Sequence, residues 1–200
     1  MTKPYDQAYF DHWYRTPGHR VGMKSLLERK VRLALAVAEY HLGHRVRSVL
    51  DVGCGEGVWR AALLAERPQI HYLGVDASAY AVRRYGQARN LKWLRFEQLA
   101  EVRFGAPVDL LVCADVVHYL KSAAVRRGLQ GFAELCDGVA FIETFARGDA
   151  FVGDTEGHVA RSASWYRQAF ADAGFTACGS HCYLSQRLKE SATALELLPA

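Results

Sequence analysis

The sequence predicts an α/β fold: a doubly wound, mostly parallel seven-stranded sheet with helices on both faces and an antiparallel hairpin at its C-terminal end. Two observations favour this fold. Short apolar runs alternate with helical patterns through the middle of the chain, and a glycine cluster follows the first of these runs. The 200 residues, half of them apolar or aromatic and 23% charged, fit one globular domain rather than a disordered chain.

The elements follow in order along the chain. Two helices, over 5–14 and 23–42, precede the sheet. The predicted strands cover 48–52, 70–75, 91–96, 108–113 and 139–144. Helices between them are predicted over 58–67, 78–87 and 122–136. The run at 108–113, VDLLVC, has the continuous apolar character of a strand that is buried on both faces.

The pattern changes after the fifth strand. Residues 146–162 are polar and rich in glycine, which predicts an irregular insertion. A helix over 164–173 follows, and segments 175–184 and 193–198 are predicted to form the closing hairpin. We expect a single domain over 1–200, with a helical cover (1–45), a core (48–144), an insertion with its helix (146–175) and the hairpin (175–198).

Charge and cysteine content exclude some classes of protein. The 25 basic and 21 acidic residues leave a net charge of +4, which is too small and too evenly spread to argue for nucleic acid. No apolar run approaches the roughly 18 residues of a membrane span, and the N-terminus lacks the apolar region of a secretory signal. Five scattered cysteines favour a reducing cytoplasm, and the carboxylates are not clustered at metal-ligand spacing, so we predict no metal. The oligomeric state stays open.

The glycine cluster carries the chemistry. Asp51 lies two residues before the first glycine of the G-x-G-x-G sequence that begins at Gly53. This spacing lets the backbone approach a ligand closely. The dinucleotide fingerprint would instead need a glycine where Val58 stands. Asp76 ends the second strand, where a carboxylate can accept hydrogen bonds from both hydroxyls of a ribose.

Three segments together, VLDVGCGEG, LGVDAS and VDLLVCADVVHYL, resemble the class I S-adenosylmethionine-dependent methyltransferases of the small-molecule type. The resemblance covers about residues 48–144 and implies an enzyme with S-adenosyl-L-methionine as its cofactor. It implies that Gly53 and Gly55 pass close to the methionine part, that Asp51 lies near the amino group, and that Asp76 binds the ribose. Four further cofactor positions are implied: Ala77, Glu97, Gln98 and Asp115. The family usually has Asp where Glu97 stands, and a turn cap is an equal interpretation of Asp115.

The acceptor is expected beyond the fourth and fifth strands, because ligands of parallel sheets bind at the carboxyl ends of the strands. His118 is the candidate catalytic base, since histidine can take up a proton near neutral pH. A buried structural histidine is the alternative. The other candidates for substrate contact are Tyr119, Glu143, His158 and Trp165.

An aromatic face runs along the first predicted helix and includes Tyr9 and Tyr14. It could pack onto the sheet, or form a lid whose rings line an electron-rich pocket around a cation. Arg20 follows it and could pair with the cofactor carboxylate or lie in solvent.

The sequence therefore favours O- or N-methylation of a small-molecule acceptor. A methyltransferase for protein or RNA is one alternative. The segment after the fourth strand reads ADVVHY, without the N/D-P-P-Y turn that accompanies methylation of exocyclic or amide nitrogens in the resembling families. A module that binds S-adenosylmethionine or a nucleotide without turnover is the other alternative.

Overall fold

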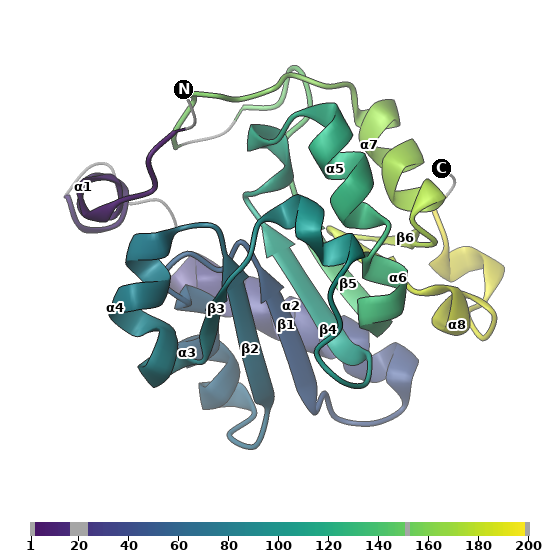
Figure 1. Cartoon of the computed structure of the whole chain (residues 1–200). Helices are drawn as coiled ribbons and strands as arrows, with labels where there is room; N and C mark the ends of the chain where they lie inside the picture. Colours follow the sequence, from purple (N-terminus) through teal and green to yellow (C-terminus); the bar gives the residue numbers. More distant parts are fainter. Residues whose placement is uncertain (1–2, 17–23, 151–152, 199–200) are drawn as a thin grey trace.

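The computed structural model describes residues 3–16, 24–150 and 153–198 (Figure 1). Seven strands form one sheet in the order β3-β2-β1-β4-β5-β7-β6. The strands are β1 (Ser48–Val52), β2 (His71–Asp76), β3 (Leu91–Trp93), β4 (Val108–Ala114), β5 (Cys136–Glu143), β6 (Thr176–Gly179) and β7 (Cys182–Leu184). The first five are parallel, and β7 runs antiparallel to both β5 and β6. The predicted fold class is confirmed.

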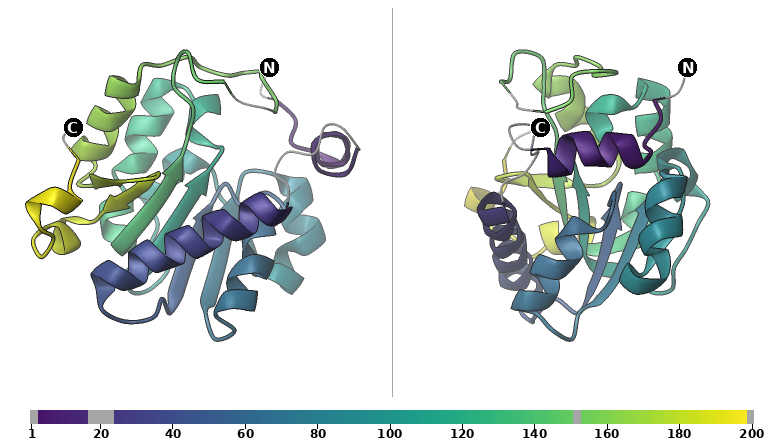
Figure 2. Two further views of the ribbon diagram at one scale, coloured as in Figure 1. Left: turned by 180° about the vertical axis from the view of Figure 1, so that it is seen from behind. Right: turned by 90° about the vertical axis from the view of Figure 1, so that its left-hand side faces the viewer.

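Helices cover both faces of the sheet (Figure 2). One face carries α2 (Lys24–Leu42), α3 (Val58–Glu66), α4 (Ala79–Arg89) and α8 (Gln186–Lys189). The other carries the 3-10 turn η2 (Phe96–Ala100) with α5 (Ser122–Leu129), α6 (Phe132–Leu135) and α7 (Ala163–Asp172). The four central residues of β4 are completely buried between the two layers, as their continuous apolar run predicts.

Two glycines let the second layer pack closely. A Cβ on Gly128 would lie 2.3 Å from the ring of Phe96, and one on Gly131 would lie 2.1 Å from the carbonyl oxygen of Leu99. The segment from α5 to α6 therefore lies directly against η2, which carries Glu97 and Gln98. The predicted helix over 122–136 is consequently two helices that meet at Gly131.

The prediction for the closing hairpin is wrong in its second half. The hairpin forms within 176–184 and turns at Ser180 and His181, both of which have positive φ. Residues 193–198 contain only the 3-10 turn η4 (Ala194–Glu196). The side chain of Leu195 in that turn is 99% exposed. Leu197 packs partly buried against the core and the Leu198 amide donates to the Ala177 carbonyl of β6 at 2.8 Å, but residues 193–198 form no strand. The third strand is also shorter than predicted, because η2 begins at Phe96.

The first predicted helix is a short α1 (Gln7–Phe10) continued by the π-helical turn η1 (Asp11–Arg15). Asp6 caps α1 by accepting a hydrogen bond from the Tyr9 amide at 3.0 Å. This segment lies across the end of the sheet at which the parallel strands finish (Figure 2, right). Within the described ranges, no helix has the length and apolar character needed to cross a membrane.

Candidate active site

The glycine loop crosses the carboxyl ends of β1 and β2. Gly53, Gly55 and Gly57 have φ values of 70°, 53° and 77°, which side chains rarely tolerate. The Gly53 amide donates to the Val75 carbonyl at 2.8 Å, and the Gly55 amide donates to Asp76 Oδ2 at 2.7 Å. The loop is thus held by the backbone and the Asp76 carboxylate at the end of β2. The side chains of Val116 and Phe10 lie directly against Gly53 and Gly55, so a Cβ at either glycine would meet them.

Asp76 links the loop to the next helix. Its Oδ1 accepts a hydrogen bond from the Ser78 amide at 2.6 Å, while Oδ2 is bound to Gly55. Burial raises the pKa of this carboxyl, and the two amide hydrogen bonds oppose that rise. A carboxylate has about four lone-pair positions, so two amide bonds leave acceptor capacity for hydroxyl groups. The observed orientation suits the ribose contact that the sequence predicts.

Asp51 is a buried carboxyl with one neutral side-chain partner. It is 2% exposed, and the Tyr72 hydroxyl donates to its Oδ2 at 2.7 Å. Burial raises its pKa to about 7, against the lowering by the Tyr72 hydrogen bond, and the nearby Asp76 adds to the rise. A cation placed beside it would favour the charged form, so the site suits a positively charged ligand group.

The predicted adenine side brings Ala77 against a residue that the sequence reasoning missed. The indole Nε1 of Trp93 donates to the Ala77 carbonyl at 3.0 Å, and the Trp93 side chain is 46% exposed. The sequence signal that could have identified Trp93 is an aromatic residue within the predicted third strand. Gln98 is engaged in η2, where its Oε1 accepts from the Arg95 amide at 2.9 Å. Glu97 lies half-buried in the first turn of η2.

Asp115 and Glu143 meet where β4 and β5 end. Asp115 has a φ of 59°, and its amide donates to the Glu143 carbonyl at 3.1 Å. Glu143 is 6% exposed and accepts from Lys30 Nζ of α2 at 2.6 Å. Burial first, then the Glu143 charge, raises the pKa of Asp115 to about 6, while Lys30 opposes the rise. Val116, not Asp115, is the capping position of the next turn, η3 (Val117–Tyr119), so the cap interpretation has no support there.

His118 lies inside the protein at this edge. It is 1% exposed, and its Nδ1 is 3.2 Å from the Thr144 hydroxyl. Its ring lies 5.6 Å from that of His158 and 5.4 Å from that of Phe145. Burial, and then the nearby His158 and Arg161, lower the pKa of His118 to about 4. The structure therefore brings both candidate histidines together, with His118 uncharged at neutral pH.

The insertion is fixed to η3. The Val159 amide donates to the His118 carbonyl at 2.8 Å, and the Tyr119 hydroxyl donates to the Asp154 carbonyl at 2.6 Å. Arg161, which is 5% exposed, donates to the carbonyls of residues 117 and 120. Trp165 does not join the histidines, since its ring lies under the Arg161 guanidinium at 4.6 Å. Arg161 was missed by the sequence reasoning, because a lone arginine in a polar insertion carries no local signal.

The aromatic N-terminal segment packs onto the glycine loop. Phe10 is 2% exposed, and its ring lies 3.2 Å from where a Cβ on Gly55 would stand. Ser78 Oγ donates to the Tyr5 carbonyl at 2.6 Å, and Arg15 binds both carboxylate oxygens of Glu56 at 2.7 and 2.8 Å. The N-terminal segment therefore packs against the glycine loop and also covers it.

Tyr9 and Tyr14 lie within this cover. Burial raises the pKa of both hydroxyls, and the nearby Asp76 and Asp115 add to the rise. The two tyrosines thus face the edge that carries the candidate cofactor and acceptor residues. Arg20 lies outside the described residues.

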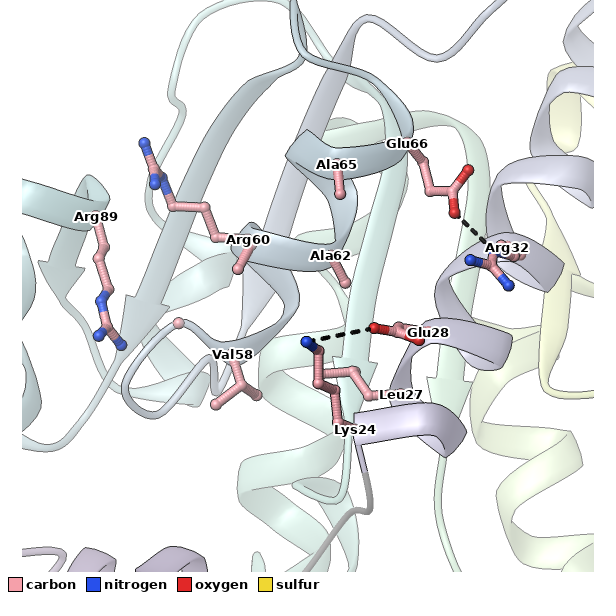
Figure 3. Close-up of a pocket in the computed structure, with 12 residues that line it drawn as sticks. Lys24, Leu27, Glu28, Arg32, Val58, Arg60, Ala62, Ala65, Glu66 and Arg89 are labelled. Atoms are coloured by element: carbon pink, nitrogen blue, oxygen red, sulfur yellow. Dashed lines mark hydrogen bonds and ion pairs between the residues drawn. The ribbon is translucent and has the colours of Figure 1, made fainter.

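A separate groove of about 540 Å³ lies between the outer sides of α2 and α3 (Figure 3). Arg32 Nε and Glu66 Oε1 form an ion pair across the groove at 2.6 Å. Lys24 Nζ lies 4.0 Å from Glu28 Oε1. No predicted site residue lines the groove. Among the described residues, no group of three or more His, Cys, Asp or Glu side chains is arranged to hold a metal ion.

The comparison with known proteins agrees with this geometry. Residues 50–138, which include the glycine loop, Asp76 and Asp115, match a family model described as a methyltransferase domain. This match confirms, over residues 50–138, the predicted resemblance to the S-adenosylmethionine-dependent methyltransferases.

One curated relative of this chain is a trans-aconitate 2-methyltransferase from Azoarcus sp., which is 36% identical over 78 residues. The match covers 38% of this chain and 30% of that protein, so it spans less than a third of the relative.

Solved structures share the fold of this chain. Magnesium protoporphyrin IX methyltransferase from Synechocystis, solved with bound S-adenosylhomocysteine, has a TM-score of 0.58 and 17% identity over 90% of this chain and 96% of that one. A sugar N-methyltransferase from Streptoalloteichus has a TM-score of 0.62 and 17% identity, over 83% and 84% of the two chains. At these identities the likeness shows the fold alone.

Proposed function

We propose that this protein transfers the methyl group of S-adenosylmethionine to an oxygen or nitrogen of a small-molecule acceptor. The observation that carries the proposal is the contact of Asp76 with the Gly55 and Ser78 amides, which orients a half-buried carboxylate at the glycine loop. Sugar and porphyrin methyltransferases among the structural relatives support a small acceptor.

The carboxyl ends of the parallel strands form one edge of the sheet, here called the strand edge. Its two sides, at β1 and β2 and at β4 and β5, have separate roles in this proposal. S-adenosylmethionine, when bound, supplies a methyl group on a positively charged sulfur. Asp76 accepts hydrogen bonds from the ribose hydroxyls, and Gly53 and Gly55 let the backbone approach the methionine part. Asp51 compensates positive charge there, because its buried carboxyl accepts a hydrogen bond from the neutral Tyr72 hydroxyl and, among the described residues, forms no ion pair. Ala77, Glu97 and Gln98 are assigned to the adenine side, and Asp115 to the methionine end.

His118 is proposed as the group that takes the acceptor's proton. With its pKa lowered to about 4, its ring is neutral at physiological pH and can accept a proton at once. The same low pKa makes it a weak base, so positioning of the acceptor must supply much of the rate. Tyr119, Glu143 and His158 lie around it and are proposed to contact the acceptor, as are the more distant Tyr9, Tyr14 and Trp165.

Calorimetry tests the cofactor part of the proposal. S-adenosylhomocysteine is expected to bind to the wild-type protein, and NAD is not, because Val58 replaces the glycine of the dinucleotide fingerprint. Binding of NAD without any response to S-adenosylhomocysteine would contradict the proposal.

Turnover is then measured with S-adenosylmethionine and a panel of small alcohols, carboxylates and amines. Formation of S-adenosylhomocysteine with one acceptor class is the expected result. Cofactor binding without transfer to any member of the panel would favour a module that binds without turnover.

A further inference from the structure

A cage of three tyrosine rings surrounds the ammonium group of Lys3. The Lys3 Nζ lies 5.2 Å from the ring centroids of Tyr9 and Tyr119 and 5.9 Å from that of Tyr5. All three distances fall within the range of about 6 Å over which a cation is attracted to an aromatic face. The rings come from two segments, since Tyr119 belongs to η3 and the other two lie in or before α1.

A carboxylate closes the cage. Asp154 of the insertion is 6% exposed and forms an ion pair with Lys3, whose Nζ also donates to the Glu156 carbonyl at 3.1 Å. Three π faces, a carboxylate and a carbonyl all attract a cation that carries N–H groups. The same set repels an anion, so the chemistry of the cage selects an ammonium group.

The walls of the cage are fixed by contacts that do not involve Lys3. The Tyr119 hydroxyl donates to the Asp154 carbonyl at 2.6 Å, and the Glu156 amide donates to Asp154 Oδ1 at 2.9 Å. The Tyr5 and Tyr9 rings meet edge to face at 5.0 Å, and the Tyr5 carbonyl accepts from Ser78. The cage would therefore keep its form if the Lys3 side chain left it.

The cage also lies on the acceptor side of the strand edge. The Tyr119 ring is 4.2 Å, centroid to centroid, from that of His118. Burial raises the pKa of the Tyr119 hydroxyl, and the nearby Asp115 adds to the rise. In Figure 1, the purple N-terminal segment meets the green insertion beyond the ends of the strands. A ligand group in the cage would thus lie beside His118, the residue proposed to take the acceptor's proton.

We propose that this cage binds the ammonium group of an amine acceptor, and that Lys3 occupies it while no acceptor is bound. The inference rests on the proposed function and narrows its substrate class to amines. Burial lowers the pKa of Lys3, and an acceptor amine in the same place would also lose its proton more easily than in water.

Removal of the internal cation tests the proposal. The Lys3→Ala variant keeps the walls and leaves the buried Asp154 carboxylate without its ammonium partner. Calorimetry without cofactor should then show 2-phenylethylamine binding at least tenfold more tightly than to the wild type. The neutral isostere 2-phenylethanol should change by less than twofold, because it offers no charge to the carboxylate.

Two further variants isolate the cage. Asp154→Asn in the Lys3→Ala background should remove the gain for the amine. Tyr119→Leu in that background should weaken amine binding, whereas Tyr119→Phe, which keeps the ring, should retain most of it. Lys189→Ala is the matched control, since Lys189 is an exposed lysine on α8. Thermal melting of each variant identifies those that are unfolded.

The proposal is overturned if folded Lys3→Ala binds the amine no more tightly than the wild type, or if the alcohol gains as much as the amine. Titration of the same proteins with S-adenosylhomocysteine separates this failure from failure of the proposed function. Cofactor binding together with no preference for the amine would contradict the proposed role of the cage and leave the proposed function standing. If the wild-type protein does not bind S-adenosylhomocysteine, the proposed function is contradicted, whatever the amine result.

Discussion

The two halves of the strand edge are built from different parts of the chain. The proposed cofactor half, at the ends of β1 and β2, is formed by backbone amides and by carboxylates between residues 51 and 78. The proposed acceptor half, at the ends of β4 and β5, joins side chains from η3, the residues after β5, the insertion and the N-terminal segment. The partners Lys3 and Glu156 are 153 positions apart.

This difference explains why one half follows a motif and the other does not. A loop whose backbone approaches a ligand closely needs residues that tolerate positive φ and lack a side chain. A short glycine pattern provides both. Side chains from four segments can be exchanged without altering the sheet, so the acceptor can vary while the cofactor half is unchanged. Substitutions in the first half should therefore affect cofactor binding, and those in the second should affect transfer.

Gly55→Val should have the largest effect. Gly55 has a φ of 53°, and a Cβ there would stand 3.2 Å from the Phe10 ring, so a branched side chain strains the loop and displaces the cover. We expect at least a 100-fold loss of affinity for S-adenosylhomocysteine by calorimetry. Gly105→Val is the control, because Gly105 has a φ of 109° in open space away from the loop. Normal binding by folded Gly55→Val would show that the loop is not the cofactor site.

His118→Ala tests the acceptor half. General-base assistance is typically worth 10²–10⁴-fold, and the low pKa of His118 places the expected loss of kcat near the lower end, at about 100-fold. Cofactor affinity should change by only a few-fold. His118→Gln should rescue little, because an amide cannot take up the proton. A rate for His118→Gln close to that of the wild type would show that His118 only orients the acceptor.

The pKa of His118 also fixes a pH dependence. A solvated histidine titrates near 6.5, whereas folded His118 titrates near 4, so the unfolded chain takes up its proton first as the pH falls. The free energy of unfolding should decrease by roughly 1–3 kcal/mol between about pH 6.5 and pH 4. His118→Gln should lack this part of the acid destabilisation in urea titrations, while substitution of the exposed His71 should retain it.

Asp76→Ala should weaken cofactor binding at least tenfold. Hydrogen bonds to a charged group contribute about 1.5–3 kcal/mol each, and the ribose offers two hydroxyls. Asp109→Ala is a matched control, because the Asp109 carboxylate accepts from the Arg47 amide at 2.7 Å near the start of β4, at the opposite edge of the sheet. Equal losses in the two variants would mean that the Asp76 effect is a loss of stability rather than of a ribose contact.

Asp51→Asn should have the smallest effect on binding and should raise stability. Folded Asp51 keeps its proton up to about pH 7, whereas the unfolded chain loses it near pH 4, so the free energy of unfolding decreases as the pH rises between these values. The Asn variant should melt at a higher temperature than the wild type at pH 8, with S-adenosylmethionine affinity reduced a few-fold. A lower melting temperature at pH 8 would mean that the charged carboxylate stabilises the fold.

The sheet could be predicted from the sequence because it depends on local patterns, and the proposed cofactor half follows from a local pattern too. The apolar run of β4 indicates a strand that is buried on both faces. The spacing from Gly53 to Asp76 indicates a loop after the first strand and a carboxylate at the end of the second. The closing hairpin was predicted incorrectly at 193–198, since apolar alternation does not distinguish a buried strand from an exposed turn such as that around Leu195. The tyrosine cage could not be predicted, because it needs Lys3, Tyr119 and Asp154 to meet across the whole fold.

A crystal structure with S-adenosylhomocysteine tests the division of the strand edge most directly. The account predicts the ribose hydroxyls within hydrogen-bond distance of Asp76, and the sulfur directed towards Asp115 and His118. A nucleoside bound in the groove between α2 and α3, or a sulfur directed away from the ends of β4 and β5, would contradict it.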